Sequence, residues 1–258
     1  MELQITRAMT NLNSISVVIT AAGKGSRSKL GFSKSLYEVA GETIINRLLK
    51  ITSDLDLKSN IVVNKNNYDE ISKSVTKIYP TCSFFIQDRQ LGMGNAILSV
   101  DRSLMKENIL LIWGDLAFLK KSTIELLIKK YFEKKLDFAF PTLISEDAYT
   151  IVKRDHKKNI INVLESNEEF KEGFGRAERD IGVFLFKRDI VLDILQEDLP
   201  NKYGRKSNEH GFLYIIEHLV KRKHTVEGMM IAKDIESLSL NTVKDIKRIN
   251  NIQSDEAN

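Results

Sequence analysis

The sequence predicts an α/β fold: a Rossmann-like, mostly parallel mixed sheet with helices on both faces and a β-hairpin flap. Short β-branched or aromatic runs alternate with helical patterns along the first half of the chain. After Tyr149 the rhythm changes to two strand-like runs joined by a polar turn. The 258 residues, 42% hydrophobic and 29% charged, are ample for a packed core and exclude a disordered chain.

The expected strands of the first half are short and bounded by turn residues. In chain order they cover residues 15–20, 60–63, 82–87, 108–113 and 137–142. Helical stretches separate them at residues 43–51, 95–103 and 123–134. Because strands and helices alternate, the strands are expected to run mostly parallel, with the helices covering both faces of the sheet.

The second half predicts the flap and the remaining elements. Residues 149–154 and 160–165, joined by the polar turn 156–159, are typical of a β-hairpin beside the main sheet. The further expectations, in order, are a loop at 167–179, a strand at 181–186, a helix at 188–195, a lid-like polar loop at 198–211, a helix at 212–221, strands at 225–231 and 235–239, and a helix at 243–250. We expect an N-terminal extension (1–14), one domain (15–252) and a polar tail (253–258).

Charge and cysteine content limit the partners and the compartment. The 39 Lys and Arg against 35 Asp and Glu give a formal charge of +4 without a basic block, so nucleic-acid binding is not indicated, whereas a polyanionic small ligand is compatible. The single cysteine, Cys82, fits a reducing cytoplasm. Apolar runs of about five residues fall far short of the roughly 20 that span a bilayer, so we expect a cytoplasmic protein without a membrane partner.

The first expected strand runs into a glycine-containing loop, Ala21-Ala22-Gly23-Lys24-Gly25-Ser26-Arg27. Its small residues let the backbone approach a ligand, its N–H groups can line a phosphate, and Lys24 and Arg27 add positive charge. A Walker A loop is absent, and Ser28 stands where a dinucleotide fingerprint needs glycine or alanine. The loop is therefore interpreted as a polyphosphate cradle, with a plain tight turn as the alternative.

Two further segments offer groups for a nucleotide. Lys34 could neutralise a second phosphate, or it could be a solvated lysine. Gln87 ends an expected strand, and its amide can both donate to and accept from a pyrimidine edge. Gly92 would let a flat base lie against the backbone, whereas the alternative is a turn capped by Asn95.

Asp115 follows the expected central strand 108–113 and Gly114. Ligands of open α/β sheets bind at the carboxyl ends of the strands, so this carboxylate is delivered to the expected binding edge. Mg²⁺ prefers such hard oxygens and takes only one or two from the protein. A helix cap or an ion-paired aspartate is the alternative interpretation.

Together these motifs resemble the sugar-nucleotide pyrophosphorylase, or nucleotidyltransferase, family from about Ile15 to Ile249. Within it the resemblance is closest to the uridylyltransferase domain of bifunctional N-acetylglucosamine-1-phosphate uridylyltransferases. Lys34 falls where the family has a Pro-Lys pair, with Ser33 replacing the proline, and the Asn241-Thr242 segment with Asp245 is similar to the family's late Asn-Thr segment. The resemblance implies these roles: catalytic Lys24, Arg27, Lys34 and Asp115; nucleotide-binding Ala21, Ala22, Gly23, Gly25, Ser26, Gln87, Gln90, Gly92 and Gly114; acceptor-binding Met93, Thr150, Glu165 and Asp180; and Mg²⁺ held by Asp115 and Asn241.

The acceptor pocket departs from this pattern. Asp180-Ile181-Gly182 stands where the uridylyltransferases have Asn-Thr-Gly, Met93 replaces a small hydroxyl residue, and Thr150 occupies a glycine position that faces the sugar. No hexapeptide-repeat region follows Ile249, so the acetyltransferase half is expected to be missing.

The resemblance implies transfer of a nucleoside monophosphate, UMP from UTP, to a sugar 1-phosphate with release of pyrophosphate and with Mg²⁺ as cofactor. A cytidylyltransferase acting on CTP and an atypical phosphorylated small molecule is the alternative within the same class. A nucleotide-binding regulatory protein without turnover is the alternative from another class, and a dinucleotide oxidoreductase does not fit the first loop. The number of associated chains is not predicted, and a homodimer is one compatible arrangement.

Overall fold

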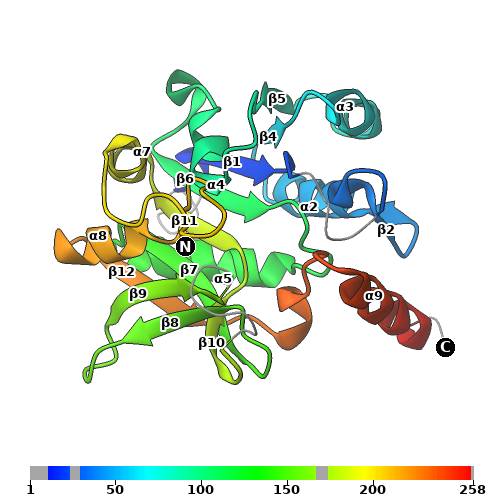
Figure 1. Cartoon of the computed structure of the whole chain (residues 1–258). Helices are drawn as coiled ribbons and strands as arrows, with labels where there is room; N and C mark the ends of the chain where they lie inside the picture. Colours follow the sequence, from blue (N-terminus) through cyan, green and yellow to red (C-terminus); the bar gives the residue numbers. More distant parts are fainter. Residues whose placement is uncertain (1–10, 24–29, 167–173, 257–258) are drawn as a thin grey trace, which may run out of the picture.

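The computed structural model describes residues 11–23, 30–166 and 174–256 and confirms the α/β fold with a mixed sheet (Figure 1). The described residues form an eight-stranded main sheet in the order β10-β7-β11-β6-β1-β4-β5, with β12 on the free edge of β7. None of the described helices is long and apolar enough to cross a membrane.

One half of the sheet is parallel, as the alternation of elements predicted. β1 (Ile15–Thr20) is central, with β4 (Ser59–Val63) on one side and β6 (Asn108–Trp113) on the other, and β5 (Ser83–Ile86) pairs with β4. All of these pairings are parallel, so their carboxyl ends meet at one edge.

The other half is built around the long strand β7 (Phe138–Ser145). β11 (Val183–Lys187) runs antiparallel between β6 and the start of β7, and β10 (Ala177–Asp180) continues along the same side of β7. β12 (Val226–Met230) pairs in parallel with the other side. Pro141 lies between the β7 residues that pair with β11 and those that pair with β10, where its missing N–H donor costs no bond to either strand.

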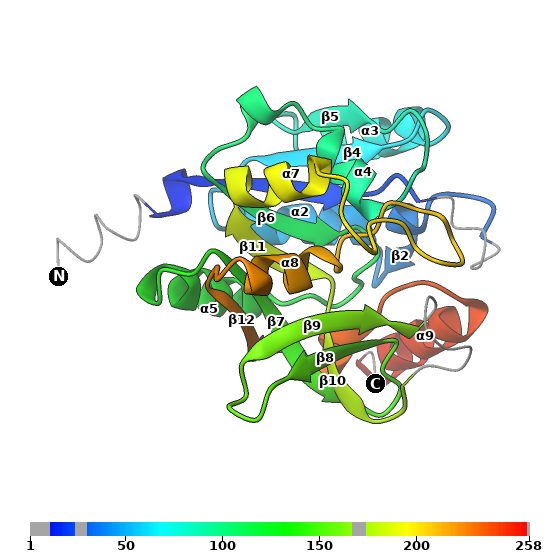
Figure 2. The ribbon, with the colours of Figure 1, turned by 60° about the vertical axis from the view of Figure 1, so that its left-hand side comes forward.

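Helices cover both faces of this sheet, and alternate strand residues point to the two sides. One core contains Val17, Ile19 and Leu110 with apolar residues of α2 (Ile44–Ser53), α3 (Tyr68–Thr76) and α5 (Lys121–Glu133). The other contains Val18 and Leu111 with apolar residues of α4 (Met93–Leu98), α7 (Arg188–Gln196) and α8 (Ile215–Lys221). Figure 2 shows α7 and α8 on the near side of the sheet.

The expected hairpin flap is present as a separate two-stranded sheet of β8 (Thr150–Arg154) and β9 (Ile160–Glu165) (Figure 2). Two side-chain contacts fix it to β10. Thr150 Oγ1 donates to Asp180 Oδ1 at 2.6 Å, and Arg154 forms an ion pair with Glu178 at 2.7 Å. The flap is therefore anchored beside the carboxyl edge of the sheet.

Several expected elements were wrong. The end of the loop expected at 167–179 belongs to β10, whose residues pair with the second half of β7. Residues 167–173 lie outside the described part. The strand expected at 235–239 is largely the 3₁₀ helix η3 (Asp234–Ser237). The cause is the fully buried Glu236 carboxylate, which accepts from the Lys233 and Lys120 N–H groups and from the Thr123 hydroxyl.

Other helices and strands also differ from the expected elements. The helix expected at 95–103 divides into α4 and the 3₁₀ helix η2 (Arg102–Leu104), whose N-cap Asp101 accepts from the Ser103 N–H. The final helix, α9 (Val243–Glu256), is longer than expected. α3 and the short paired strands β2 (Glu38–Val39) and β3 (Glu42–Thr43) were not anticipated. In Figure 1 α9 lies beside β2, which brings the end of the chain to the segment that follows β1.

Candidate active site

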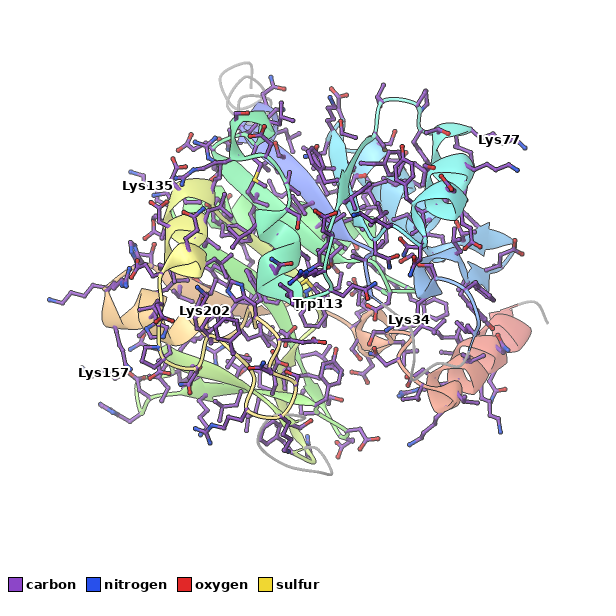
Figure 3. The ribbon with its side chains drawn as sticks, turned by 45° about the horizontal axis from the view of Figure 1, so that its top comes forward. Lys34, Lys77, Trp113, Lys135, Lys157 and Lys202 are labelled. Carbon is purple, nitrogen blue, oxygen red and sulfur yellow. The ribbon has the colours of Figure 1, made fainter. Side chains whose placement is uncertain are left out.

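A cavity of about 1470 Å³ opens at the carboxyl edge of the parallel strands. Three parts of the fold surround it: the residues that follow β1, β5 and β6, the hairpin flap, and the segments around 201–211 and 234–248. Figure 3 places Lys34 and Trp113 near the middle of the molecule, whereas Lys77, Lys135 and Lys157 lie at its periphery. The cavity stands where ligands of open α/β sheets bind.

Lys34 joins two oxygen-bearing side chains inside this cavity. Its ammonium donates to Asp115 Oδ2 at 3.1 Å and to Asn241 Oδ1 at 2.8 Å. Lys34 and Asp115 side chains are each only 17% exposed. The structure thus brings together three predicted residues from the 3₁₀ helix η1 (Lys34–Leu36), from the end of β6 and from the segment before α9.

Asn241 is held in this position by its neighbours. Its side-chain amide donates to Ser239 Oγ at 2.8 Å, and its backbone N–H donates to Asp245 Oδ2 at 3.0 Å. The Leu240 N–H in turn donates to the Asp115 carbonyl oxygen at 3.0 Å. These bonds fix the late Asn-Thr segment against the end of β6.

The residues fit a divalent cation with few protein ligands. Asp115 Oδ1 is buried and has no hydrogen-bond partner among the described residues, so within them one carboxylate oxygen beside the Lys34 ammonium is unsatisfied. The described residues contain no group of three or more His, Cys, Asp or Glu side chains suited to a metal ion. Mg²⁺ keeps several waters and accepts one or two protein oxygens, so Asp115 and Asn241 have the right donor chemistry for it.

The start of the glycine-containing loop is held by three amides. The Ala21 carbonyl accepts from Asn67 Nδ2, and the Ala22 carbonyl accepts from both Asn64 Nδ2 and Gln90 Nε2. Ala21, Ala22 and Gly23 line the cavity, whereas the predicted residues Lys24, Gly25, Ser26 and Arg27 lie outside the described residues. The sequence analysis missed the two asparagines, although both lie in the polar run that follows β4.

Gly114 is required by close packing between the ends of two strands. A Cβ atom there would lie 2.6 Å from the Thr20 carbonyl oxygen, and the Gly114 N–H donates to that same oxygen at 3.0 Å. A larger residue would separate the ends of β1 and β6 and displace Asp115, which follows directly.

Gln87 is buried at the end of β5 and lines the cavity. Its amide nitrogen donates to the Gly92 carbonyl at 3.0 Å and to Asn95 Oδ1 at 2.8 Å. The nitrogen is therefore already engaged within the protein, whereas no described residue donates a hydrogen bond to Oε1, which can accept one from a ligand.

Gly92 is needed for a reason that the sequence did not reveal. It has a φ of 104°, and a Cβ there would lie 2.5 Å from the backbone oxygen of His210. The His210 N–H donates to the Leu91 carbonyl at 2.6 Å, and the Gly94 N–H donates to the His210 carbonyl at 3.0 Å. Burial, reinforced by the charge of Lys202, lowers the pKa of His210 to about 4. The segment around residue 210 is thus packed firmly against Gly92 and the start of α4.

The predicted acceptor-binding residues separate into two groups. Met93, Thr150 and Glu165 line the cavity. Asp180 is fully buried and is not among the lining residues, since its carboxylate accepts from Thr150 Oγ1 at 2.6 Å and from the Gly182 N–H at 2.8 Å. Asp180 therefore holds the Thr150 side chain in place through this hydrogen bond. Direct contact of Asp180 with an acceptor stays a prediction.

Four further lining residues were not singled out from the sequence, although two of them lie in the lid-like loop expected at 198–211: Tyr149, Arg179, Tyr203 and His210. The Arg179 guanidinium lies 3.6 Å from the centroid of the Tyr149 ring. Burial raises the pKa of Tyr149 to about 12, an effect that the Arg179 charge opposes and the Asp180 and Asp115 carboxylates reinforce. Arg179 escaped notice because it was placed in a loop, although a lone arginine beside Asp180 was visible in the sequence.

Comparison with known proteins relates the chain to a family and to a fold. A family model described as a MobA-like NTP transferase domain matches residues 17–172. The bifunctional protein GlmU of Solibacter usitatus is 26% identical over 249 residues, which cover 93% of this chain and 52% of the relative. GlmU of Carboxydothermus hydrogenoformans is 28% identical over 237 residues, covering 90% and 51%. The chain thus spans about half the length of these curated relatives.

Two solved structures share the fold. A UDP-glucose pyrophosphorylase complexed with UDP-glucose superposes with a TM-score of 0.72 at 17% identity, covering 93% of this chain and 98% of that one. HddC from Yersinia pseudotuberculosis, complexed with GMP-PN, superposes with a TM-score of 0.64 at 19% identity, covering 92% and 98%. The matched family model spans more than half of the sequence and includes Lys34, Gln87 and Asp115, so the chain belongs to the MobA-like NTP transferase domain family.

Proposed function

We propose that this protein is a Mg²⁺-dependent nucleotidyltransferase that transfers UMP from UTP to a sugar 1-phosphate and releases pyrophosphate. The observation that carries the proposal is the Lys34 ammonium held between Asp115 and Asn241 oxygens at the carboxyl edge of the sheet. The surrounding cavity of about 1470 Å³ has room for a nucleotide and an acceptor together. Membership of the NTP transferase family supports the same class of reaction.

The reaction requires positioning and charge neutralisation, and it requires no protein nucleophile. A phosphate oxygen of the acceptor attacks the α-phosphorus in line, the new P–O bond forms, and the bond to the β-phosphate breaks to release pyrophosphate. The acceptor phosphate is already ionised at neutral pH. We expect Lys34 to exchange Asp115 and Asn241 for oxygens of the α-phosphate and to stabilise the charge that develops there.

Asp115 and Asn241 would hold the metal, since the unsatisfied Asp115 Oδ1 offers a free carboxylate oxygen. Bound Mg²⁺ would neutralise phosphate charge and help to align the two substrates. Lys24 and Arg27, at the end of the glycine-containing loop, are proposed to hold the departing β- and γ-phosphates.

The base would be read at Gln87. Because its amide nitrogen already donates to Gly92 and Asn95, its oxygen is the atom left to accept a hydrogen bond. The uracil imide N–H and the cytosine amino group can both donate to such an oxygen. A cytidylyltransferase acting on a different phosphorylated acceptor is therefore the second candidate function.

Transfer of the α-phosphate label tests the proposal. UTP and CTP labelled at the α-phosphorus are incubated with Mg²⁺ and a panel of phosphorylated acceptors, and the labelled acceptor product is separated and counted. Label transfer from UTP supports the proposal, and preferential transfer from CTP supports the second candidate. Absence of transfer from either nucleotide with every acceptor would refute both. The same assay is run with Lys34→Ala. Its matched control is Lys77→Ala, which changes an exposed lysine far from the cavity.

A further inference from the structure

Arg179 is a buried cation that pairs with no carboxylate in the part of the chain that the structure describes. Only 4% of the residue is exposed, yet among the described residues no carboxylate oxygen lies within 4 Å of its guanidinium. Its Nε donates to the Asp180 carbonyl at 2.9 Å, and its guanidinium covers the Tyr149 ring at 3.6 Å. Nη2 is buried and has no hydrogen-bond partner among the described residues.

The two neighbours of Arg179 in β10 differ from it, because both have partners for their charged groups. Glu178 is paired with Arg154 at 2.7 Å, and the Asp180 carboxylate is occupied by Thr150 and Gly182. Strand geometry places Arg179 on the opposite face from both acidic residues. A buried charge that lacks a partner is costly, so an ionised guanidinium kept in this position points to an anion that is supplied from outside.

That anion would enter the same cavity as the reacting groups. Arg179 and Tyr149 both line it, and Tyr149 lies within electrostatic reach of Arg179 and of Asp115. Arg179 nevertheless forms no hydrogen bond with the Lys34, Asp115 and Asn241 cluster. A phosphate that reacts beside Lys34 therefore leaves Arg179 available for a different group of the same ligand.

We propose that Arg179 binds a second anionic group of the acceptor, a carboxylate or a phosphate, distinct from the phosphate that attacks the nucleotide. This proposal rests on the proposed function in one respect, because only that function identifies the bound molecule as the acceptor. Stacking on Tyr149 and the bond to the Asp180 carbonyl hold the guanidinium in one orientation, which suits the planar, paired recognition that arginine gives to carboxylates and phosphates. Acceptors with an acidic substituent are then favoured over their neutral counterparts.

Anion binding tests the site without requiring turnover. The melting temperature of the full-length protein is measured in acetate, in inorganic phosphate and in chloride at equal ionic strength. The wild type is expected to melt higher in acetate or phosphate than in chloride, and Arg179→Gln is expected to lose more than half of that increase. Arg176→Gln, which changes an arginine that is 72% exposed nearby, should keep it. Equal responses of Arg179→Gln and the wild type would overturn the proposal. A larger effect of acetate identifies a carboxylate site, and a larger effect of phosphate identifies a phosphate site.

A matched acceptor pair supplies a second measurement that needs only the wild type, so the proposal stays testable if Arg179→Gln does not fold. The pair is glucose 1-phosphate and glucuronic acid 1-phosphate, with an aldose 1,6-bisphosphate as the phosphate counterpart. We expect kcat/KM to be about tenfold or more higher for an acidic member, and in Arg179→Gln the ratio should fall toward one. A wild type that does not favour either acidic acceptor would overturn the proposal. If no acceptor supports turnover, the proposed function fails, while the melting measurements still decide the anion site.

Discussion

The Lys34 ammonium donates a hydrogen bond of 2.8 Å to Asn241 Oδ1, although 207 positions separate the two residues in the sequence. The contact joins two distant parts of the chain within the candidate active site, because Lys34 lies shortly before β2 and Asn241 lies shortly before α9. A second contact follows the same path, since the Tyr37 hydroxyl donates to Asn250 Oδ1 at 2.7 Å. The end of the domain is thus held against its beginning at the point where the reaction is proposed to occur.

Lys34→Ala should reduce kcat by roughly 10²-fold or more, because it removes a preorganised charge that is proposed to stabilise the α-phosphate. It should also strengthen Mn²⁺ binding to the nucleotide-free protein, since no ammonium would then compete for the Asp115 and Asn241 oxygens. Electron paramagnetic resonance of free Mn²⁺ measures the second effect. Full activity together with unchanged Mn²⁺ binding would show that Lys34 is a spectator.

Gly94→Ala should destabilise the protein by about 1–3 kcal/mol, although alanine normally favours a helix over glycine. The reason is steric, because the new Cβ would clash with the Gly211 carbonyl oxygen. Chemical denaturation measures the free energy of unfolding. Gly211→Ala is the control from the same interface, since its Cβ would make only an ordinary contact at 3.6 Å. Equal stability of the two variants would contradict this packing.

His210 should make the protein less stable in acid. Its pKa is lowered from 6.5 to about 4 in the folded state, so between these values the unfolded chain binds more protons than the folded one. The free energy of unfolding should be highest above pH 6.5 and fall, by up to about 3 kcal/mol from this residue, as the pH drops toward 4.

Denaturation curves of His210→Gln at several pH values test this dependence. The variant is expected to lose part of the decrease in stability between pH 6.5 and pH 4. His156→Gln, at an exposed position in the flap turn, should retain the wild-type dependence. A wild-type profile in His210→Gln would assign the acid sensitivity to other groups.

Asp115→Asn should abolish Mn²⁺ binding at the site and reduce turnover by about 10²-fold or more, while the fold is retained because the substitution is isosteric. Circular dichroism checks the fold, and titration calorimetry checks the binding of Mn²⁺. Asp88→Asn, which changes an exposed aspartate paired with Lys65, is the control. Unaltered metal binding in Asp115→Asn would remove Asp115 from the metal site.

Local sequence patterns predicted the parallel strands of the first half, but they did not predict α3 or the short paired strands β2 and β3. β1 and β6 were predicted with their observed ends, since each is a short, mostly apolar run bounded by turn residues. β10 was missed because its four residues, Ala-Glu-Arg-Asp, are mostly charged and are stabilised by pairing with β7 and by the ion pair of Glu178 with Arg154 of the flap. Such pairing depends on residues that are remote in the sequence and leaves no local signal.

The same difference, between local sequence patterns and contacts of residues remote in the sequence, applies to the candidate active site. Lys34, Asp115 and Asn241 were identified from motifs, and the structure brings them into contact. The resemblance predicted Asp180 as an acceptor ligand, but only the three-dimensional contacts reveal that its carboxylate is already used by Thr150 and Gly182. Arg179 was missed for the complementary reason, because an unpaired buried charge can be recognised only when the surroundings of the side chain are known.

Pyrophosphate release tests the central claim most directly. Wild-type protein and Asp115→Asn are assayed with UTP or CTP, with and without Mg²⁺, and with and without phosphorylated acceptors, and pyrophosphate is measured by an enzyme-coupled assay. The wild type is expected to release pyrophosphate only when nucleotide, acceptor and Mg²⁺ are present together, and Asp115→Asn is expected to release almost none. Absence of release under every condition, or equal rates for the two proteins, would contradict the claim.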